Sequence, residues 1–159
     1  MTSLGKETIH RYKEFIEWMD TLNDLDDRIW LTPIAEGKAT VAEIVSHLKN
    51  WDNYLINTII PAIKKGEGMV FPDFDSFNKR AYEYARSGIS KNRLLYEFKQ
   101  TRLELVELLL SNPAIATKHV TANGVENCPH TGTPYSLLYI IYEFIEHDIH
   151  HKNQILSVI

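Results

Sequence analysis

The chain has 159 residues, of which 44% are hydrophobic and 24% charged, and its formal net charge is -4. This length and composition favour a single globular domain, residues 1–159, with a sizeable core. The sequence has no stripe of basic residues, no apolar run of about 20 residues and no apolar segment near its start, so it predicts no nucleic-acid binding, no membrane span and a cytoplasmic location. The single cysteine, Cys128, excludes an internal disulfide.

Two helices are predicted in the first part of the chain. Apolar residues recur every three or four positions over residues 4–23, which indicates an amphipathic helix. A loop follows, and then Thr40 and Glu43 form a capping-box pattern, so a second helix is expected over residues 41–61. Pro61 predicts a kink or an end there.

The second part of the chain predicts a short helix over residues 75–86 and two long helices over residues 91–110 and 134–159. Thr133 is the expected cap of the last helix, with a proline in its first turn. Residues 113–133 have turn signals and little helical pattern. The whole pattern predicts an all-α fold: a four-helix bundle of up-and-down type, with a long crossover and a short extra helix.

The last predicted helix carries two histidines with metal-binding spacing. His147 and His151 are four residues apart, so both rings lie on one helix face, beside Ile140 and Phe144. His150 falls on the polar stripe of the helix and is expected in solvent. Two inward-facing histidines need a partner, because unpaired buried polar groups are costly, and one metal ion would satisfy both.

His47 is the best candidate for a third ligand. Catalytic zinc, for example, typically takes three protein ligands and leaves a position open for water. Glu43, His47, Trp51 and Tyr54 form one line on the second helix, at the border of its apolar sector, where a facing helix can meet it. Trp51 and Tyr54 are therefore candidates for the wall of a pocket, with ordinary core packing as the alternative.

These residues carry a family resemblance. The blocks GKATVAEIVSHLKNWDNYL and EFIEHDIHHKNQI resemble the two metal motifs of the DinB-like superfamily of metal-binding four-helix bundles. His47, His147 and His151 match the family's three histidines, and Gln154 matches its trailing glutamine. The resemblance implies a DinB-like bundle with a divalent metal ion, often nickel or zinc, and open coordination positions. It also implies thiol-dependent transferases or isomerases that use a low-molecular-weight thiol.

Other residues near these motifs have two interpretations each. Glu43 and Glu143 lie one turn before a histidine and are candidate general bases for water, or else solvated surface groups. Asp148 falls toward the apolar sector, where it hydrogen-bonds to a ligand histidine or forms an ion pair or cap elsewhere. Gln154 is assigned the same supporting role by the resemblance. His130, in a loop, is a candidate for the mouth of the site.

The sequence predicts a metal-dependent enzyme acting on a small molecule. Thiol transfer has a slight advantage from the resemblance, with the thiol supplied as a cosubstrate, and metal-assisted hydrolysis is the alternative. A non-catalytic module that binds or sequesters a small molecule, and a structural metal site with a closed shell of four ligands, both stay open. The first helix and the loop after it carry more aromatic residues than one apolar helix face requires: Tyr12, Phe15, Trp18 and Trp30. An exposed group of such residues favours a homodimer, and the alternative is that these residues fill the core of the bundle.

Overall fold

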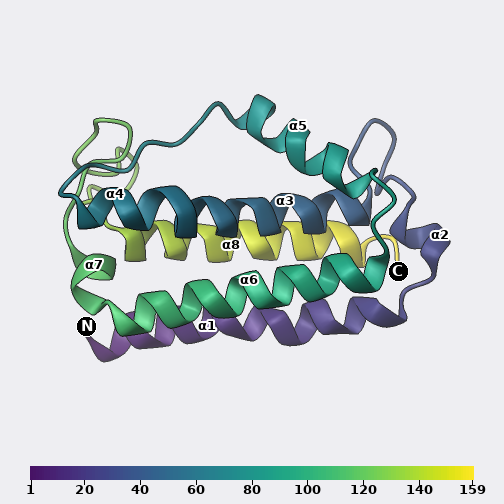
Figure 1. Cartoon of the computed structure of the whole chain (residues 1–159), viewed down its shortest axis with the longest axis horizontal. Helices are drawn as coiled ribbons and strands as arrows, with labels where there is room; N and C mark the ends of the chain where they lie inside the picture. Colours follow the sequence, from purple (N-terminus) through teal and green to yellow (C-terminus); the bar gives the residue numbers. More distant parts are fainter.

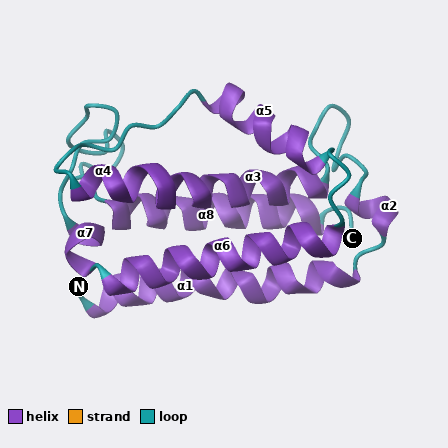
Figure 2. Ribbon diagram, viewed as in Figure 1, coloured by secondary structure: helices purple, strands orange, loops and turns teal.

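A computed structural model describes all of residues 1–159 and consists of helices joined by loops (Figure 1; Figure 2). The four long helices are α1 (Ser3–Asp20), α3 (Val41–Tyr54), α6 (Lys91–Ser111) and α8 (Leu137–Leu156). The short helices are α2 (Asp27–Trp30), α4 (Ile60–Lys64), α5 (Phe74–Ala85) and α7 (Pro113–Thr117), with a 3-10 turn at Thr21–Asp24 and a π-helical turn at Leu55–Ile59. The predicted all-α four-helix bundle is confirmed. None of the helices combines the length and the apolar character that a membrane-spanning segment requires.

The directions of the four long helices differ from those in an up-and-down bundle, in which each helix is antiparallel to the one before it. In Figure 1, α1 and α8 run from left to right, whereas α3 and α6 both run from right to left. The predicted crossover, residues 65–90, returns the chain along the bundle between α3 and α6 and carries α5 along the outer side of α3 (Figure 1). Because of this return, α3 and α6 are parallel neighbours, and the up-and-down prediction is wrong.

Side-chain caps set where the long helices begin. Thr40 and Glu43 form the predicted capping box at the start of α3. The last helix begins at Leu137 with Ser136 as its cap, three residues later than Thr133 and Pro134 predict. Residues 133–135 are instead held by backbone hydrogen bonds to the preceding loop, so they are not free to enter the helix.

Pro61 is accommodated inside a continuous helical rod. A proline has no N–H and crowds the preceding turn, which disfavours regular α-helix there. The chain passes from α3 through the π-helical turn at Leu55–Ile59 into α4, and the rod ends at Lys64, before Gly66 with a φ of 81°. Two further short helices, α2 and α7, lie in stretches that the sequence predicted as loop.

The first nine residues of helix α3 are buried on all sides. Residues 41–49 are all buried, because α5 covers the face of α3 that a four-helix bundle alone would leave in water. Ala81 is buried on α5, and the Ser46 hydroxyl donates to its carbonyl at 2.6 Å, which allows close approach of the two helices. This extra layer is why His47, expected at the border of the core, is buried.

A buried polar layer separates the two apolar clusters of the core. It takes one side chain from each long helix: Tyr12, Asp52, Arg102 and Asp148. The Arg102 guanidinium contacts Asp52 at 2.7 Å and Asp148 at 2.9 Å, and both Asp148 oxygens accept from it. Asp148 therefore forms the ion pair that was its alternative interpretation and makes no hydrogen bond to a histidine.

The aromatic residues of the first helix and loop pack inside the bundle. Tyr12 and Trp30 are buried, and Phe15 and Trp18 are half-buried, with Phe15 6.2 Å from the ring of Phe98. The rings of Phe15 and Trp18 lie 5.5 Å apart and keep part of their surface exposed. The homodimer stays a prediction, because core packing accounts for Tyr12 and Trp30 and for only part of Phe15 and Trp18.

Candidate metal centre

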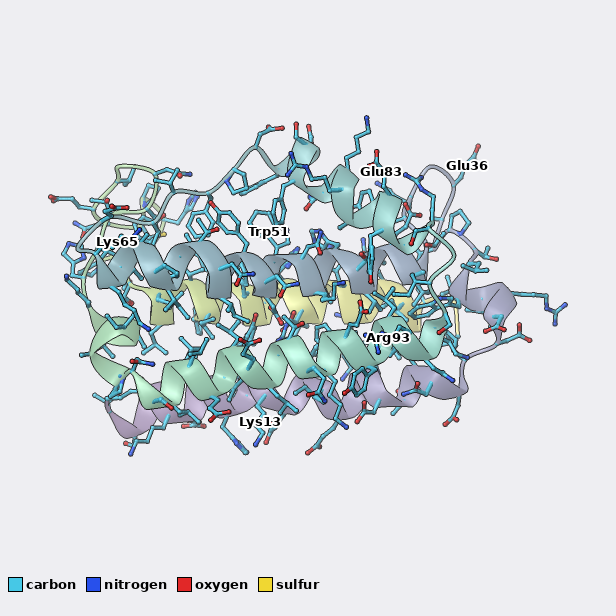
Figure 3. All side chains as sticks on the ribbon, in the orientation of Figure 1. Lys13, Glu36, Trp51, Lys65, Glu83 and Arg93 are labelled. Carbon is cyan, nitrogen blue, oxygen red and sulfur yellow. The ribbon has the colours of Figure 1, made fainter.

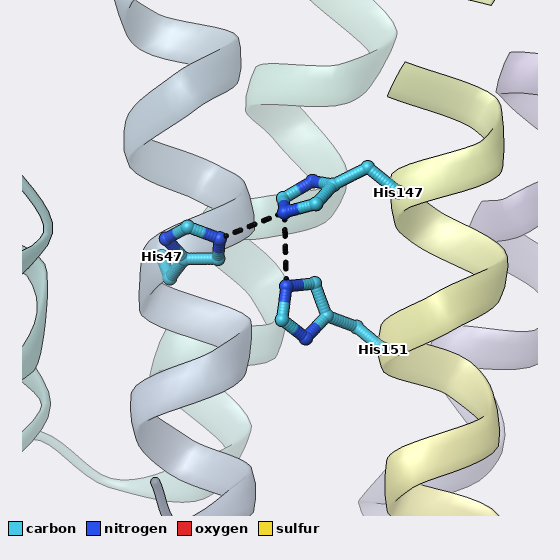
Figure 4. Close-up of side chains that lie close together, drawn as sticks. All are labelled: His47, His147 and His151. Carbon is cyan, nitrogen blue, oxygen red and sulfur yellow. Dashed lines mark hydrogen bonds between the residues drawn. The ribbon is translucent and has the colours of Figure 1, made fainter. Parts of the chain in front are cut away.

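Three histidine rings from two facing helices meet at one point. His47 projects from α3, and His147 and His151 project from successive turns of α8 (Figure 4). Nε2 of His147 lies 3.2 Å from Nε2 of His47 and 3.0 Å from Nε2 of His151. The three nitrogens that can bind a metal all lie within 4.8 Å of one another. The structure thus brings together all three predicted ligands, and His150 is exposed, as the sequence predicts.

Asn78, on α5, determines which nitrogen of His47 carries the proton. Oδ1 of Asn78 lies 2.9 Å from Nδ1 of His47 and accepts from the indole Nε1 of Trp51 at 3.0 Å. An indole N–H can only donate, so the Asn78 atom that it contacts must be the amide oxygen. That oxygen can only accept, so Nδ1 of His47 donates, and Nε2 keeps its lone pair for a metal.

His151 is held in the same way at the other side of the cluster. Its Nδ1 donates to Oε1 of Gln154 at 2.7 Å, so its Nε2 also keeps a lone pair. Nε2 of His147 carries at most one proton and can donate to only one of its two neighbours. At least one of the two Nε2–Nε2 contacts, at about 3 Å, is therefore left without a hydrogen bond, and a cation bound between the nitrogens would satisfy it.

The three histidines of the cluster do not become positively charged by taking up a proton at neutral pH. Burial, reinforced by the neighbouring His151, lowers the pKa of His47 to about 4 and that of His147 to about 3. Burial also lowers the pKa of His151. All three rings are therefore uncharged at neutral pH and can bind a metal without first losing a proton. Three imidazoles suit a divalent ion such as zinc or nickel, so these residues fit a metal site.

A cavity of about 290 Å³ opens beside the cluster, at the small end of the range for ligand sites. His47 and His147 form part of its wall, so a metal held by the cluster would be within reach of a molecule in the cavity. The apolar part of the wall is formed by Trp51, Phe71, Phe74, Ile140 and Phe144. Its other polar residues are Asn78 and Glu143.

The two candidate general bases lie in different surroundings. Glu143 lines the cavity one turn before His147, and it makes no hydrogen bond or ion pair. Glu43 is used in the cap of α3, where it accepts from the backbone of Thr40 at 3.1 Å, and it lies 3.7 Å from Arg86. Only Glu143 is therefore placed to take a proton from a molecule in the cavity.

The remaining candidates lie outside the cavity. Tyr54 packs against Trp51 with ring centroids 5.9 Å apart, and its hydroxyl donates to the carbonyl of Val70. His130 is exposed in its loop and does not line the cavity. Neither residue can contact a ligand bound beside the histidines without a rearrangement of the wall.

Sequence reasoning missed Asn78 and the phenylalanines that precede it. Asn78 lies on the face of α5 that also carries the buried Ala81 and Ala85, and a polar residue on that face was the available signal. Phe71 and Phe74 come just before and at the start of α5, where no helical periodicity distinguishes a cavity wall from a loop. Their placement depends on how α5 docks on α3.

Replacing Asn78 by alanine should weaken metal binding by about 10–100-fold, the usual effect of removing a hydrogen bond from a ligand histidine. The physical reason is that His47 loses the acceptor that fixes its tautomer and ring orientation. Affinity is measured by competition with a chromogenic chelator. Lys79→Ala, at an exposed neighbour on α5, is the matched control, and equal affinities of the two variants would contradict the role of Asn78.

Comparison with known proteins gives the fold and the family of the chain. The chain is similar in structure to YfiT from Bacillus subtilis, described as a probable metal-dependent hydrolase with an unusual four-helix bundle topology. The TM-score is 0.72 and the sequence identity 14%, and the match covers 99% of this chain and 87% of YfiT, which shows a shared fold. No protein of curated function matches the sequence significantly. The model of the DinB superfamily matches residues 14–155, so the chain belongs to the DinB superfamily.

Proposed function

We propose that this protein is a metal-dependent hydrolase of a small molecule, with zinc or nickel held by His47, His147 and His151. The observation that carries the proposal is a cluster of three metal-binding nitrogens at the wall of a cavity that also holds the free carboxylate of Glu143. A divalent ion bound here would polarise a substrate carbonyl and lower the pKa of water. The description of YfiT as a probable metal-dependent hydrolase also supports the proposal.

Three polar residues near the histidines take part in the proposed reaction. The hydrogen bonds that His47 and His151 donate to Asn78 and Gln154 orient the two rings. Glu143 accepts a proton from a water molecule while the oxygen of that water adds to the acyl carbon of the substrate. The bond from the acyl carbon to the leaving oxygen or nitrogen then breaks, and Glu143 returns the proton to that atom. The products are a carboxylic acid and an alcohol or amine.

Two alternatives receive less support from the geometry. A structural metal site needs a closed shell of four ligands, and no fourth histidine, cysteine or acidic group joins the cluster of three. Transfer of a thiol needs a cosubstrate, because Cys128 is buried in a loop and does not line the cavity. Any thiol would have to come from solution, so adding a thiol to the assay tests for this reaction.

Glu143→Gln should lower kcat by about 10²–10⁴-fold while leaving the metal content unchanged, because the amide cannot accept the proton but keeps the shape of the side chain. The assay uses metal-loaded protein and a panel of small esters and amides, each with and without cysteine as a low-molecular-weight thiol. Glu146→Gln, exposed on the same helix, is the matched control.

The outcomes separate the candidate functions. Turnover that needs no thiol and depends on Glu143 supports hydrolysis. A product formed only when thiol is present would replace hydrolysis by thiol transfer. Tight binding of panel members without any turnover would indicate a binding or sequestering module.

A further inference from the structure

One wall of the cavity is built from aromatic rings that pack around Trp51. The indole projects from α3 into the space below the segment that leads into α5 (Figure 3). The ring centroid of Trp51 lies 5.4 Å from that of Phe74, 6.4 Å from that of Phe71 and 6.2 Å from that of Phe144. These distances are within the range for aromatic packing, and all four rings line the cavity. Trp51 is only 6% exposed and also packs on Phe77, so a flat ligand in the cavity would meet part of the indole together with the neighbouring phenylalanine rings.

The wall is held in place before any ligand binds. Asp73 caps α5 by accepting from the backbone N–H of Ser76 at 3.0 Å, which fixes the helix end that carries Phe74. The backbone N–H of Phe71 donates to Oδ1 of Asn123 at 2.8 Å, and the Tyr54 hydroxyl donates to the carbonyl of Val70. A preformed wall binds a ligand with little cost for ordering its own side chains.

The wall also leaves apolar surface in contact with water. Phe74 is 60% exposed although its ring lies against Trp51 at the cavity. Covering such a ring by an apolar group is favourable by roughly 25 cal/mol per Å² of surface removed from water. The cavity is therefore suited to an apolar, flat group, and its 290 Å³ holds the volume of about ten water molecules.

The charges at the cavity disfavour an anionic group on that wall. Glu143 is the only charged side chain in the lining, and no lysine or arginine lines the cavity. A phosphate or sulfonate placed against Trp51 and Phe74 would lose its hydration without gaining a partner, and it would share the cavity with the carboxylate of Glu143.

We infer that the substrate is a small neutral ester or amide that carries an aromatic group, and that Phe74 and Trp51 determine this specificity. The inference rests on the hydrolase function proposed above. The aromatic group packs against the rings of Trp51 and Phe74, and the carbonyl reaches toward the side of the cavity formed by His47 and His147.

A binding experiment tests the ligand class without needing turnover. Acetanilide and 4-sulfoacetanilide differ only in the sulfonate, and each is titrated into metal-free protein while the indole N–H signal of Trp51 is followed by NMR. Acetanilide should shift this signal, and 4-sulfoacetanilide should bind about tenfold more weakly or worse. Phe74→Ala should weaken acetanilide binding by about two- to tenfold, the usual range for one aromatic contact.

Tyr96→Ala removes an exposed aromatic side chain outside the cavity and is the matched control for Phe74→Ala. Because Phe74 is itself exposed, its removal leaves the core intact, and circular dichroism verifies the fold of both variants. No response of Trp51 to acetanilide, or equal binding of the sulfonated analogue, would overturn the inference.

A kinetic experiment keeps the two proposals separable. Metal-loaded protein is given phenyl acetate or 4-sulfophenyl acetate, and the acid released is titrated at constant pH. Preference for phenyl acetate that is reduced by Phe74→Ala supports both proposals. Binding of acetanilide without hydrolysis of either ester contradicts the hydrolase and leaves the ligand class standing. Hydrolysis of both esters at equal kcat/KM, unaffected by Phe74→Ala, supports the hydrolase and overturns the substrate class.

Discussion

Replacing His147 or His151 by alanine will leave the purified protein without bound metal, whereas replacing His150 will leave its metal content unchanged. The three Nε2 atoms of the cluster are the only close set of metal-binding atoms, so losing one leaves too few ligands to retain the ion. His150 lies on the same helix between the two ligands but is exposed. Metal analysis of protein purified without an affinity tag measures the difference, and equal loss in all three variants would refute the assignment.

The same variants connect the metal to the stability of the fold. A metal that binds only the folded chain should raise its free energy of unfolding by about 2.7 kcal/mol at a hundredfold excess over Kd. This gain should vanish with a chelator and in His147→Ala.

The metal-free protein should also lose stability as the pH falls from about 6.5 toward about 4. In the folded chain the pKa values of His47 and His147 are lowered to about 4 and about 3, so these rings stay uncharged in this range. In the unfolded chain the same rings take up protons below about pH 6.5, which favours the unfolded state. Urea titrations with and without chelator measure both effects.

Replacing Arg102 by methionine will destabilise the fold by about 3–5 kcal/mol, the usual cost of removing one partner from a buried ion pair. Arg102 and both of its carboxylate partners are buried, so the variant leaves Asp52 and Asp148 without a cation. The carboxylates lie on the two helices that carry the histidines, α3 and α8. Metal affinity should therefore fall together with the free energy of unfolding.

A matched control and a compensating variant make the result specific. Arg93→Met removes an exposed arginine of the same helix, whose pair with Glu97 is worth at most about 1 kcal/mol. Adding Asp52→Asn and Asp148→Asn to Arg102→Met should restore part of the lost stability, because no uncompensated charge then remains buried. A fully stable Arg102→Met protein would show that the polar layer does not hold the helices together.

The elements that could be predicted from the sequence are those set by local patterns. The four long helices follow from apolar periodicity, and the start of α3 follows from a capping box of two residues. His147 and His151 could be paired because four residues make one turn of a single helix. His47 could be added because a helix has a definable face and because the motif around it resembles a family pattern.

What could not be predicted depends on contacts between distant parts of the chain. The parallel course of α3 and α6 depends on the path of the crossover, which no local pattern encodes. Asp148 was ambiguous because its partner, Arg102, is 46 residues away on another helix. Asn78 was missed for the same reason, since its two partners, His47 and Trp51, lie on a different helix.

The docking of α5 outside the bundle has a kinetic consequence. This helix buries only Ala81 and Ala85 completely, yet it supplies the acceptor for His47 and one ring of the cavity wall. Segments with few buried apolar contacts open locally at a lower free energy than the rest of a fold. Each opening of α5 would free the ring of His47 from Asn78. The exchange rate of the metal would then depend on this local opening, while the four long helices stay packed.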